Sequence, residues 1–325
     1  AESDSWMTVD DVRYRLLDKD NKESNQRVID VLGKLGVETL HRQIQQEIEQ
    51  TSGVPILREL GVKELSLADV AAALKRSDLS EGIDQFLGGK HLLRALWGEC
   101  DRLLKGQKGV PIQPLALWPT IAGSYKPAKD MFRADDDYKI RRIVEGFCLD
   151  VEFLDDAMPS SFEGLRGVVD SFQLVHLVDA LASSIDSNAN KLTQVDDKQR
   201  KRLFKWIYDH KEELEDDPSL KTRLASLPQY PTEKGPRSLE VAYWPTGFKD
   251  RLGVVETINP DALPKGGKEL LELLDVKKLD FETYCTKSLP DAFRDDKVKP
   301  GQQRDLIKEL AINLKRIAET VAIII

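Results

Sequence analysis

The residues best suited to catalysis lie near the end of the chain, where Pro260-Asp261 is followed by Asp275-Val276-Lys277. Two carboxylates in this order can hold a divalent metal ion, and a lysine two residues after the second can position or activate a water molecule. The pattern is typical of metal-dependent nucleases, and it gives one hypothesis for the function, a nuclease of the PD-(D/E)xK class.

An internal repeat weakens this hypothesis. Residues 276–284 repeat residues 62–70, so the counterpart of Asp275 is Gly61, and the counterpart of the Pro-Asp pair is Asp155-Asp156, which lacks the proline. Residues 264–274 predict a turn and a helix, whereas the nuclease core needs hairpin strands between its acidic residues. We keep the nuclease as the alternative function.

A second kind of chemistry, phosphate binding, is suggested by Gly88-Gly89-Lys90. A Walker loop needs a first glycine separated by four residues from the Gly-Lys pair, and Ser or Thr after the lysine, but His91 follows here and Gly82 lies too far upstream. The other Gly-Gly pair, at 266–267, has too few glycines and the wrong following residues. We therefore expect a helix-to-helix turn at 88–90 and no cofactor, including no ATP or ADP.

The remaining reactive side chains form no recognisable site. The run at 135–137, three aspartates, lacks the glycine and distal glutamate of a calcium loop and predicts a helix start instead. No cysteine or histidine spacing suits zinc, and no Gly-x-Ser-x-Gly occurs. The residues concerned are Cys100, Cys148, Cys285, His41, His91, His176 and His210. No catalytic, metal-binding or cofactor-binding residue is predicted.

The elements that would position such residues recur along the chain in one order. Residues 62–70 (Val-Lys-Glu-Leu-Ser-Leu-Ala-Asp-Val) return 214 positions later as 276–284, each with an N-cap residue in the middle. Halfway between them, Leu174, Leu177 and Leu181 have the spacing of Leu67, Val70 and Leu74. This common period predicts duplicated modules well above the size of solenoid repeats.

Two further blocks share this order. Residues 118–123 (Trp-Pro-Thr-Ile-Ala-Gly) recur as 230–235 (Tyr-Pro-Thr-Glu-Lys-Gly), and each block predicts a hairpin with its glycine at a position of positive φ. Residues 151–159 (Val-Glu-Phe-Leu at the start) are answered by 255–264 (Val-Glu-Thr-Ile). The large aromatic residues near these blocks are predicted to be core anchors rather than an exposed stripe; they are Trp118, Trp206, Trp244, Tyr230 and Tyr243.

Helical spacing is predicted over most of the rest of the chain. It covers the first 60 residues, where a capping-box-like pattern at 8–11 precedes Val12, and it covers 92–104, 201–214 and 305–320, while 183–190 predicts an exposed loop. The predicted fold class is α+β and predominantly helical, with repeated modules of a helix cluster plus a small antiparallel β-hairpin sheet. The predicted domains are an N-terminal helical segment (1–59), two repeat modules (60–166 and 167–273) and the start of a third (274–325).

The amino-acid composition limits the classes of function that the chain can have. The chain has 325 residues, 41% hydrophobic and 32% charged, with a net charge of −8 and a pI near 5.3. These values favour a soluble globular cytoplasmic chain and argue against a nucleic-acid partner, which needs a basic surplus, and against a membrane partner. Three isoleucines at 323–325 follow a helix-like stretch, from which we expect the chain to be part of a longer polypeptide.

The order of the blocks resembles the sacsin-type repeat region of large bacterial proteins that carry an ATPase module like that of the ninety-kilodalton heat-shock protein (the GHKL type). The resemblance rests on residues 60–67, 117–123, 227–232 and 151–155 and covers 55–320. It implies a non-catalytic scaffold or protein-interaction region of a chaperone-like ATPase, set in bacterial anti-phage defence. Its partners would be proteins or other domains of the same polypeptide. No stretch here resembles the nucleotide pocket of the family.

Overall fold

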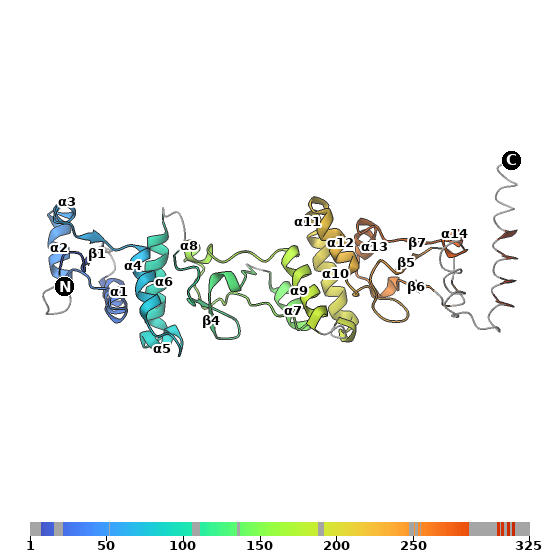
Figure 1. Cartoon of the computed structure of the whole chain (residues 1–325), viewed down its shortest axis with the longest axis horizontal. Coiled ribbons are helices and arrows are strands. Elements are labelled where there is room, and N and C mark those ends of the chain that lie inside the picture. The colour runs from blue at the N-terminus through green and yellow to red at the C-terminus, as the bar shows by residue number, and fades with distance from the viewer. Residues whose placement is uncertain are drawn as a thin grey trace. The chain divides into compact units, whose positions relative to one another are not determined.

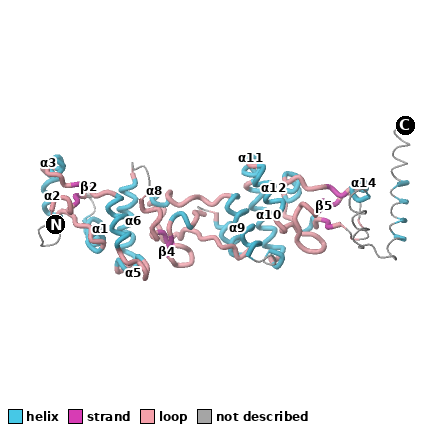
Figure 2. The backbone as a smooth tube through the Cα atoms, in the orientation of Figure 1, coloured by secondary structure: helices cyan, strands magenta, loops and turns pink. Residues whose placement is uncertain are grey.

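The computed structural model describes residues 8–15, 22–51, 53–105, 111–134, 137–187, 192–246, 250, 253, 255–285 and parts of 304–315. It divides the chain into two compact units: unit 1 is 1–136 with 151–172, and unit 2 is 137–150 with 173–325. Each unit consists mainly of helices with a few short strands between them (Figure 1), so the predicted α+β, mostly helical class is confirmed. Long loops join the elements (Figure 2).

The described part of unit 1 contains helices and two two-stranded sheets. Its helices are α1 (Lys22–Lys34), α2 (Arg42–Gln50), α3 (Val54–Glu59), α4 (Leu67–Arg76), α5 (Ile83–Leu87), α6 (Lys90–Leu104), η1 (Ala128–Asp130) and α8 (Glu163–Arg166). Its strands are β1 (Arg13–Tyr14), β2 (Lys63–Glu64), β3 (Trp118–Pro119) and β4 (Tyr125–Lys126). One sheet pairs β1 with β2, and the other pairs β3 with β4.

Unit 2 has the same mixture. Its helices are α7 (Tyr138–Gly146), α9 (Leu174–Ser187), η2 (Leu192–Gln194), α10 (Asp197–Asp209), α11 (Lys211–Asp216), α12 (Pro218–Ser226), η3 (Pro260–Ala262), α13 (Gly267–Leu273) and α14 (Phe281–Thr283). Its strands are β5 (Ala242–Pro245), β6 (Glu256–Thr257) and β7 (Lys278–Leu279).

Side-chain caps start the repeated helices where the sequence predicts them. Ser66 and Asp69 form a complete capping box at α4, and Asp280 caps α14, 214 positions later, by accepting from the Thr283 amide. Asp137 caps α7 by accepting from the Lys139 amide, as expected of a helix start. These caps satisfy amides that would otherwise lack partners in the first turn of a helix.

The two predicted hairpins occupy the same backbone setting. Thr120 pairs antiparallel with Leu154, and Thr232 pairs antiparallel with Ile258. The amide of Asp155 donates to Pro119 O at 2.8 Å, and the amide of Asn259 donates to Pro231 O at 2.9 Å. The turn glycines have φ of 83° at 123 and 104° at 235. The prediction that these blocks are structural repeats is confirmed.

A second repeated device, which the sequence analysis missed, is a three-segment parallel pairing. In unit 1, Arg13 pairs with Thr39 while the next residue, Tyr14, pairs with Glu64. The device recurs in unit 1 at Phe132 with Phe153 and Arg133 with Ser171, and in unit 2 at Tyr243 with Thr257 and Trp244 with Lys278. Residues 37–40 (Val-Glu-Thr-Leu) are therefore a third copy of the 151–154 and 255–258 block.

This device corrects the predicted N-terminal helix. The backbone of Arg13 donates to Glu38 O and accepts from the Leu40 amide, so residues 13–14 form a strand and not the beginning of a helix at Val12. Local spacing cannot detect such pairing, because the partners come from distant segments. Helices α1 and α2 form as predicted. In addition to the predicted antiparallel hairpins, the molecule thus contains short parallel sheets.

Two further expectations differ from the structure. The predicted loop at 183–190 is helical up to Ser187, where α9 ends, and Ser184 is buried there. The predicted helix at 201–214 is two helices, α10 and α11, because the chain bends at His210, whose Nδ1 lies 2.8 Å from Trp206 O. The helix predicted over 305–320 falls largely outside the described residues.

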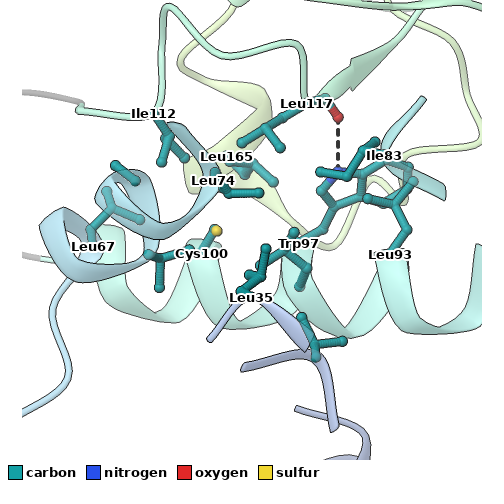
Figure 3. Close-up of a cluster of buried hydrophobic side chains, with 14 of the residues drawn as sticks. Leu35, Leu67, Leu74, Ile83, Leu93, Trp97, Cys100, Ile112, Leu117 and Leu165 are labelled. Atoms are coloured by element: carbon teal, nitrogen blue, oxygen red, sulfur yellow. Dashed lines mark hydrogen bonds between the residues drawn. The ribbon is translucent and has the colours of Figure 1, made fainter. Parts of the chain in front are cut away.

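The core of unit 1 gathers around α6. Figure 3 shows Trp97, Cys100 and Leu93 of α6 packed with Leu35, Leu74 and Leu165, and the Trp97 indole Nε1 donating to Leu117 O at 3.0 Å. In unit 2 the corresponding hydrogen bond comes from Arg200 of α10, whose Nη1 donates to Gln229 O at 3.0 Å. Each unit thus ties its long helix to the carbonyl that precedes the hairpin.

None of the helices in the described part of the chain is long and apolar enough to cross a membrane.

Candidate functional site

Unit 1 contains a groove of about 950 Å³ beside α6. Its other walls come from α1, the hairpin turn and the loop before α8. Helices α1 and α6 are antiparallel here, because Asn25 shares the Arg15 guanidinium with Glu99 while Lys34 Nζ reaches Leu87 O. We call this groove 1. Its charged lining residues are Arg15, Glu23, Arg27, Asp84, Lys90, Arg94, Glu99, Arg102 and Asp155.

A buried ion network forms the floor of groove 1. The Glu99 carboxylate, 2% exposed, accepts from Arg15 Nη2 at 2.9 Å and from Arg102 Nη2 at 2.6 Å. Burial works to raise the pKa of Glu99, but the hydrogen bonds from Arg102 and Arg15 outweigh it and hold the pKa below its ordinary value. The carboxylate is therefore ionised and committed to its two arginines, which makes it a structural group and not a general acid.

The far wall of groove 1 comes from the hairpin turn. Burial, and after it the nearby Asp84 carboxylate, raises the pKa of Tyr125 to about 12.

Gly88 ends α5 in the left-handed region and Gly89 precedes α6, so the predicted helix-to-helix turn at Gly88-Gly89-Lys90 is confirmed. The lining of groove 1 combines charged side chains with the aromatic rings of Trp97, Tyr125 and Phe162.

Unit 2 carries a matching groove of about 510 Å³ between α7 and α10, which we call groove 2. The helices are again antiparallel, since Asp137 Oδ2 accepts from Trp206 Nε1 at 2.5 Å while Gly146 packs on Gln199. Its lining residues are Lys139, Arg142, Ile143, Asp197, Lys198, Lys201, Arg202, Lys205 and Trp206.

The two grooves are the same site in two repeats. At the period of 107 positions, Glu99 corresponds to Trp206 and Arg94 to Lys201. In both units the residue at this position of the long helix bonds to a side chain that precedes the antiparallel helix, Arg15 in unit 1 and Asp137 in unit 2. The fold therefore builds one groove per repeat and the side chains set its character.

The nuclease residues do not assemble. Asp275 has a side chain 86% exposed and faces Lys221 at 3.9 Å, while Lys277 Nζ donates to Glu240 O at 2.8 Å. Asp261 lies in η3, where its carbonyl accepts from Lys201. Residues 267–273 are helix α13, as the sequence predicts, and not strands. Within the described residues, no three His, Cys, Asp or Glu side chains gather into a metal site.

Most of the predicted core anchors are buried. Trp118 and Tyr230 are fully buried and Trp206 is 3% exposed, whereas Tyr243 and Trp244 are only half-buried. Cys100 is buried, but Cys148 is exposed at φ 49° and Cys285 is half-buried, and all three are free thiols. Of the three thiols, only that of Cys100 is fully buried.

Neither groove is predicted from the sequence. A signal was present for groove 2, since Lys198, Lys201, Arg202 and Lys205 recur at the spacing of one helix face. Nothing in the sequence indicates that α7 lies against this face. No protein-family profile, curated protein or solved structure matches this chain.

Proposed function

We propose that this chain is a non-catalytic scaffold that binds proteins, as the repeat region of a larger cytoplasmic chaperone-like ATPase. We infer the parent ATPase and the setting of bacterial anti-phage defence from the resemblance to sacsin-type repeats. The structure supports the scaffold part through one observation, the recurrence of the groove between antiparallel helices at the same place in successive repeats.

Repetition of this kind suits binding better than chemistry. A catalytic site needs particular side chains at fixed distances, whereas the repeated grooves keep their place between two antiparallel helices and exchange the residues, as Glu99 for Trp206. Grooves between helices are a common place to dock an amphipathic segment. Different residues in each groove would let one polypeptide hold several segments, and binding at several linked sites strengthens attachment without tight individual contacts.

The test is a holding assay. Reduced insulin, whose B chain aggregates, is followed by light scattering with and without an equimolar amount of the purified full chain, in the absence of nucleotide. The proposal predicts that scattering is suppressed in proportion to the added chain and that ATP with magnesium changes nothing for the isolated chain. Unaltered scattering at tenfold excess of the chain would count against a protein-binding role.

A further inference from the structure

Groove 2 has a charge surplus that groove 1 lacks. Six cationic side chains and a single carboxylate, that of Asp197, line groove 2, whereas the cations and carboxylates of groove 1 nearly balance. The surplus stands out because the whole chain has a net charge of −8. The six cations are Lys139, Arg142, Lys198, Lys201, Arg202 and Lys205.

These cations are poorly neutralised by the protein itself. Among the described residues, Lys139, Arg142 and Lys198 form no ion pair, and all three are exposed. Lys201 and Arg202 contact neutral oxygens, Asp261 O at 2.8 Å and Gln199 Oε1 at 3.2 Å. Only Lys205 has a carboxylate, that of Asp209. Like charges held this close repel one another, and a bound anionic partner would relieve that repulsion.

The floor of groove 2 is apolar and rigid. Ile143 is 1% exposed and Trp206 is 3% exposed. The indole is fixed on both sides, since it donates to Asp137 and stacks on His210 with ring centroids 3.9 Å apart. Above this closed floor, the alkyl stems of the lysines and arginines can cover aliphatic side chains of a bound segment, while their charged ends meet carboxylates beside them.

The same geometry disfavours a nucleic acid. Single strands bind by stacking bases on exposed aromatic faces along a basic track. The Trp206 ring is already stacked and buried, and the exposed Tyr138 ring has the Arg141 guanidinium over it at 5.3 Å from the ring centroid. The Trp206 ring therefore offers no free face at the groove, and Tyr138 is not among the lining residues of groove 2.

We infer that groove 2 is a docking site for an acidic amphipathic helix of a partner protein. This inference deepens the proposed function and rests on it, because it names the chemistry of one segment that the scaffold holds. Aliphatic side chains of the segment lie along the alkyl stems of Lys198 and Arg202, and its carboxylates pair with Lys139, Arg142 and Lys198.

The experiment uses the purified full chain and a fluorescein-labelled peptide of about 18 residues with Glu and Leu at helical spacing. Fluorescence anisotropy gives its affinity, next to a Lys and Leu counterpart and a single-stranded thymidine oligonucleotide of equal charge. We expect only the Glu and Leu peptide to bind, more weakly as salt rises from about 50 to 300 mM. Lys198→Glu with Arg202→Glu should weaken binding at least tenfold.

The matched control is Lys75→Glu with Lys129→Glu, two exposed lysines outside both grooves, which should leave the affinity unchanged. Circular dichroism verifies that both double variants fold, and Lys198→Gln with Arg202→Gln gives a milder loss if charge is the cause. Equal loss in the control, no peptide binding, or tighter binding of the oligonucleotide would each overturn the inference. If the chain suppresses the light scattering of reduced insulin but does not bind the peptide, only this inference fails. If the chain does not suppress the scattering, the proposed function fails.

Discussion

Arg15 and Glu99 are joined by a buried ion pair of 2.9 Å although 84 positions separate them. The pair links the segment after β1 to the middle of α6, and Arg102 completes it from the next turn. Its counterpart in unit 2 is the hydrogen bond between Asp137 and Trp206. Both units thus have a contact between the long helix and a residue that precedes its antiparallel neighbour. The contact is an ion pair in unit 1 and a hydrogen bond in unit 2.

Removing the charge of Glu99 should destabilise unit 1. Glu99→Gln leaves the guanidinium of Arg15 buried without its carboxylate, a change that costs about 3 kcal/mol at pH 7. Urea denaturation measures this loss. The control is Glu23→Gln, in an exposed pair with Arg27, which should change the free energy of unfolding by less than about 0.5 kcal/mol. Equal effects of the two substitutions would contradict the network.

The effect of Glu99 should depend on pH with a defined sign. Because its folded-state pKa is lowered, its contribution to stability is complete above its ordinary value of 4.5 and is lost as the pH falls through the folded-state value. The gap in stability between the wild type and Glu99→Gln should therefore shrink from pH 7 towards pH 3. A gap that widens on acidification would show that the pKa is raised instead.

Two glycines should respond in opposite directions to alanine. Gly61 has φ of 83°, so Gly61→Ala forces a left-handed alanine and costs about 1 kcal/mol. Gly33 is helical in α1 with open space around its Cα, so Gly33→Ala gains about 0.5 kcal/mol of helix propensity. Thermal unfolding of both variants measures the difference, and two shifts of the same sign would refute the assigned backbone conformations.

The tie between each long helix and its hairpin should be measurable in unit 2. Arg200 is 1% exposed and donates to Gln229 O and Leu192 O, and burial lowers its pKa. Arg200→Met leaves both carbonyls without that donor and should cost about 2 kcal/mol. The neighbour Arg202→Met, which loses one half-exposed contact, should cost less than about 0.5 kcal/mol. If Arg200→Met left the free energy of unfolding unchanged, Arg200 would not have the role in unit 2 that Trp97 has in unit 1.

The isolated chain should have no nuclease activity. Supercoiled DNA incubated with the chain and magnesium is expected to remain intact, because Asp261, Asp275 and Lys277 have separate contacts. Gel electrophoresis is the measurement. Cutting that disappears in Asp275→Asn would restore the nuclease hypothesis.

Local chemistry made part of this fold predictable. The Pro-Thr-x-x-Gly turns, the Ser66 cap and the amphipathic α6 depend on neighbours in sequence, and they form as expected. The pairing of Arg13 with Thr39 joins two-residue segments across a helix, so no local period marks it. Residues 37–40 carry the repeated letters, but only the backbone pairing shows that they begin the series. The grooves were hidden for a similar reason, since they exist only where two helices meet.

Hydrogen–deuterium exchange of the full chain tests the scaffold proposal most directly. The chain is compared alone and with reduced carboxymethylated α-lactalbumin, an unfolded and acidic partner, and amide protection is mapped along the sequence. The proposal predicts added protection in the helices of the grooves, strongest in α7 and α10 around Arg142 and Lys201. Unchanged exchange in α1, α6, α7 and α10 at saturating partner, or protection confined to the loop around Asp261, would contradict it.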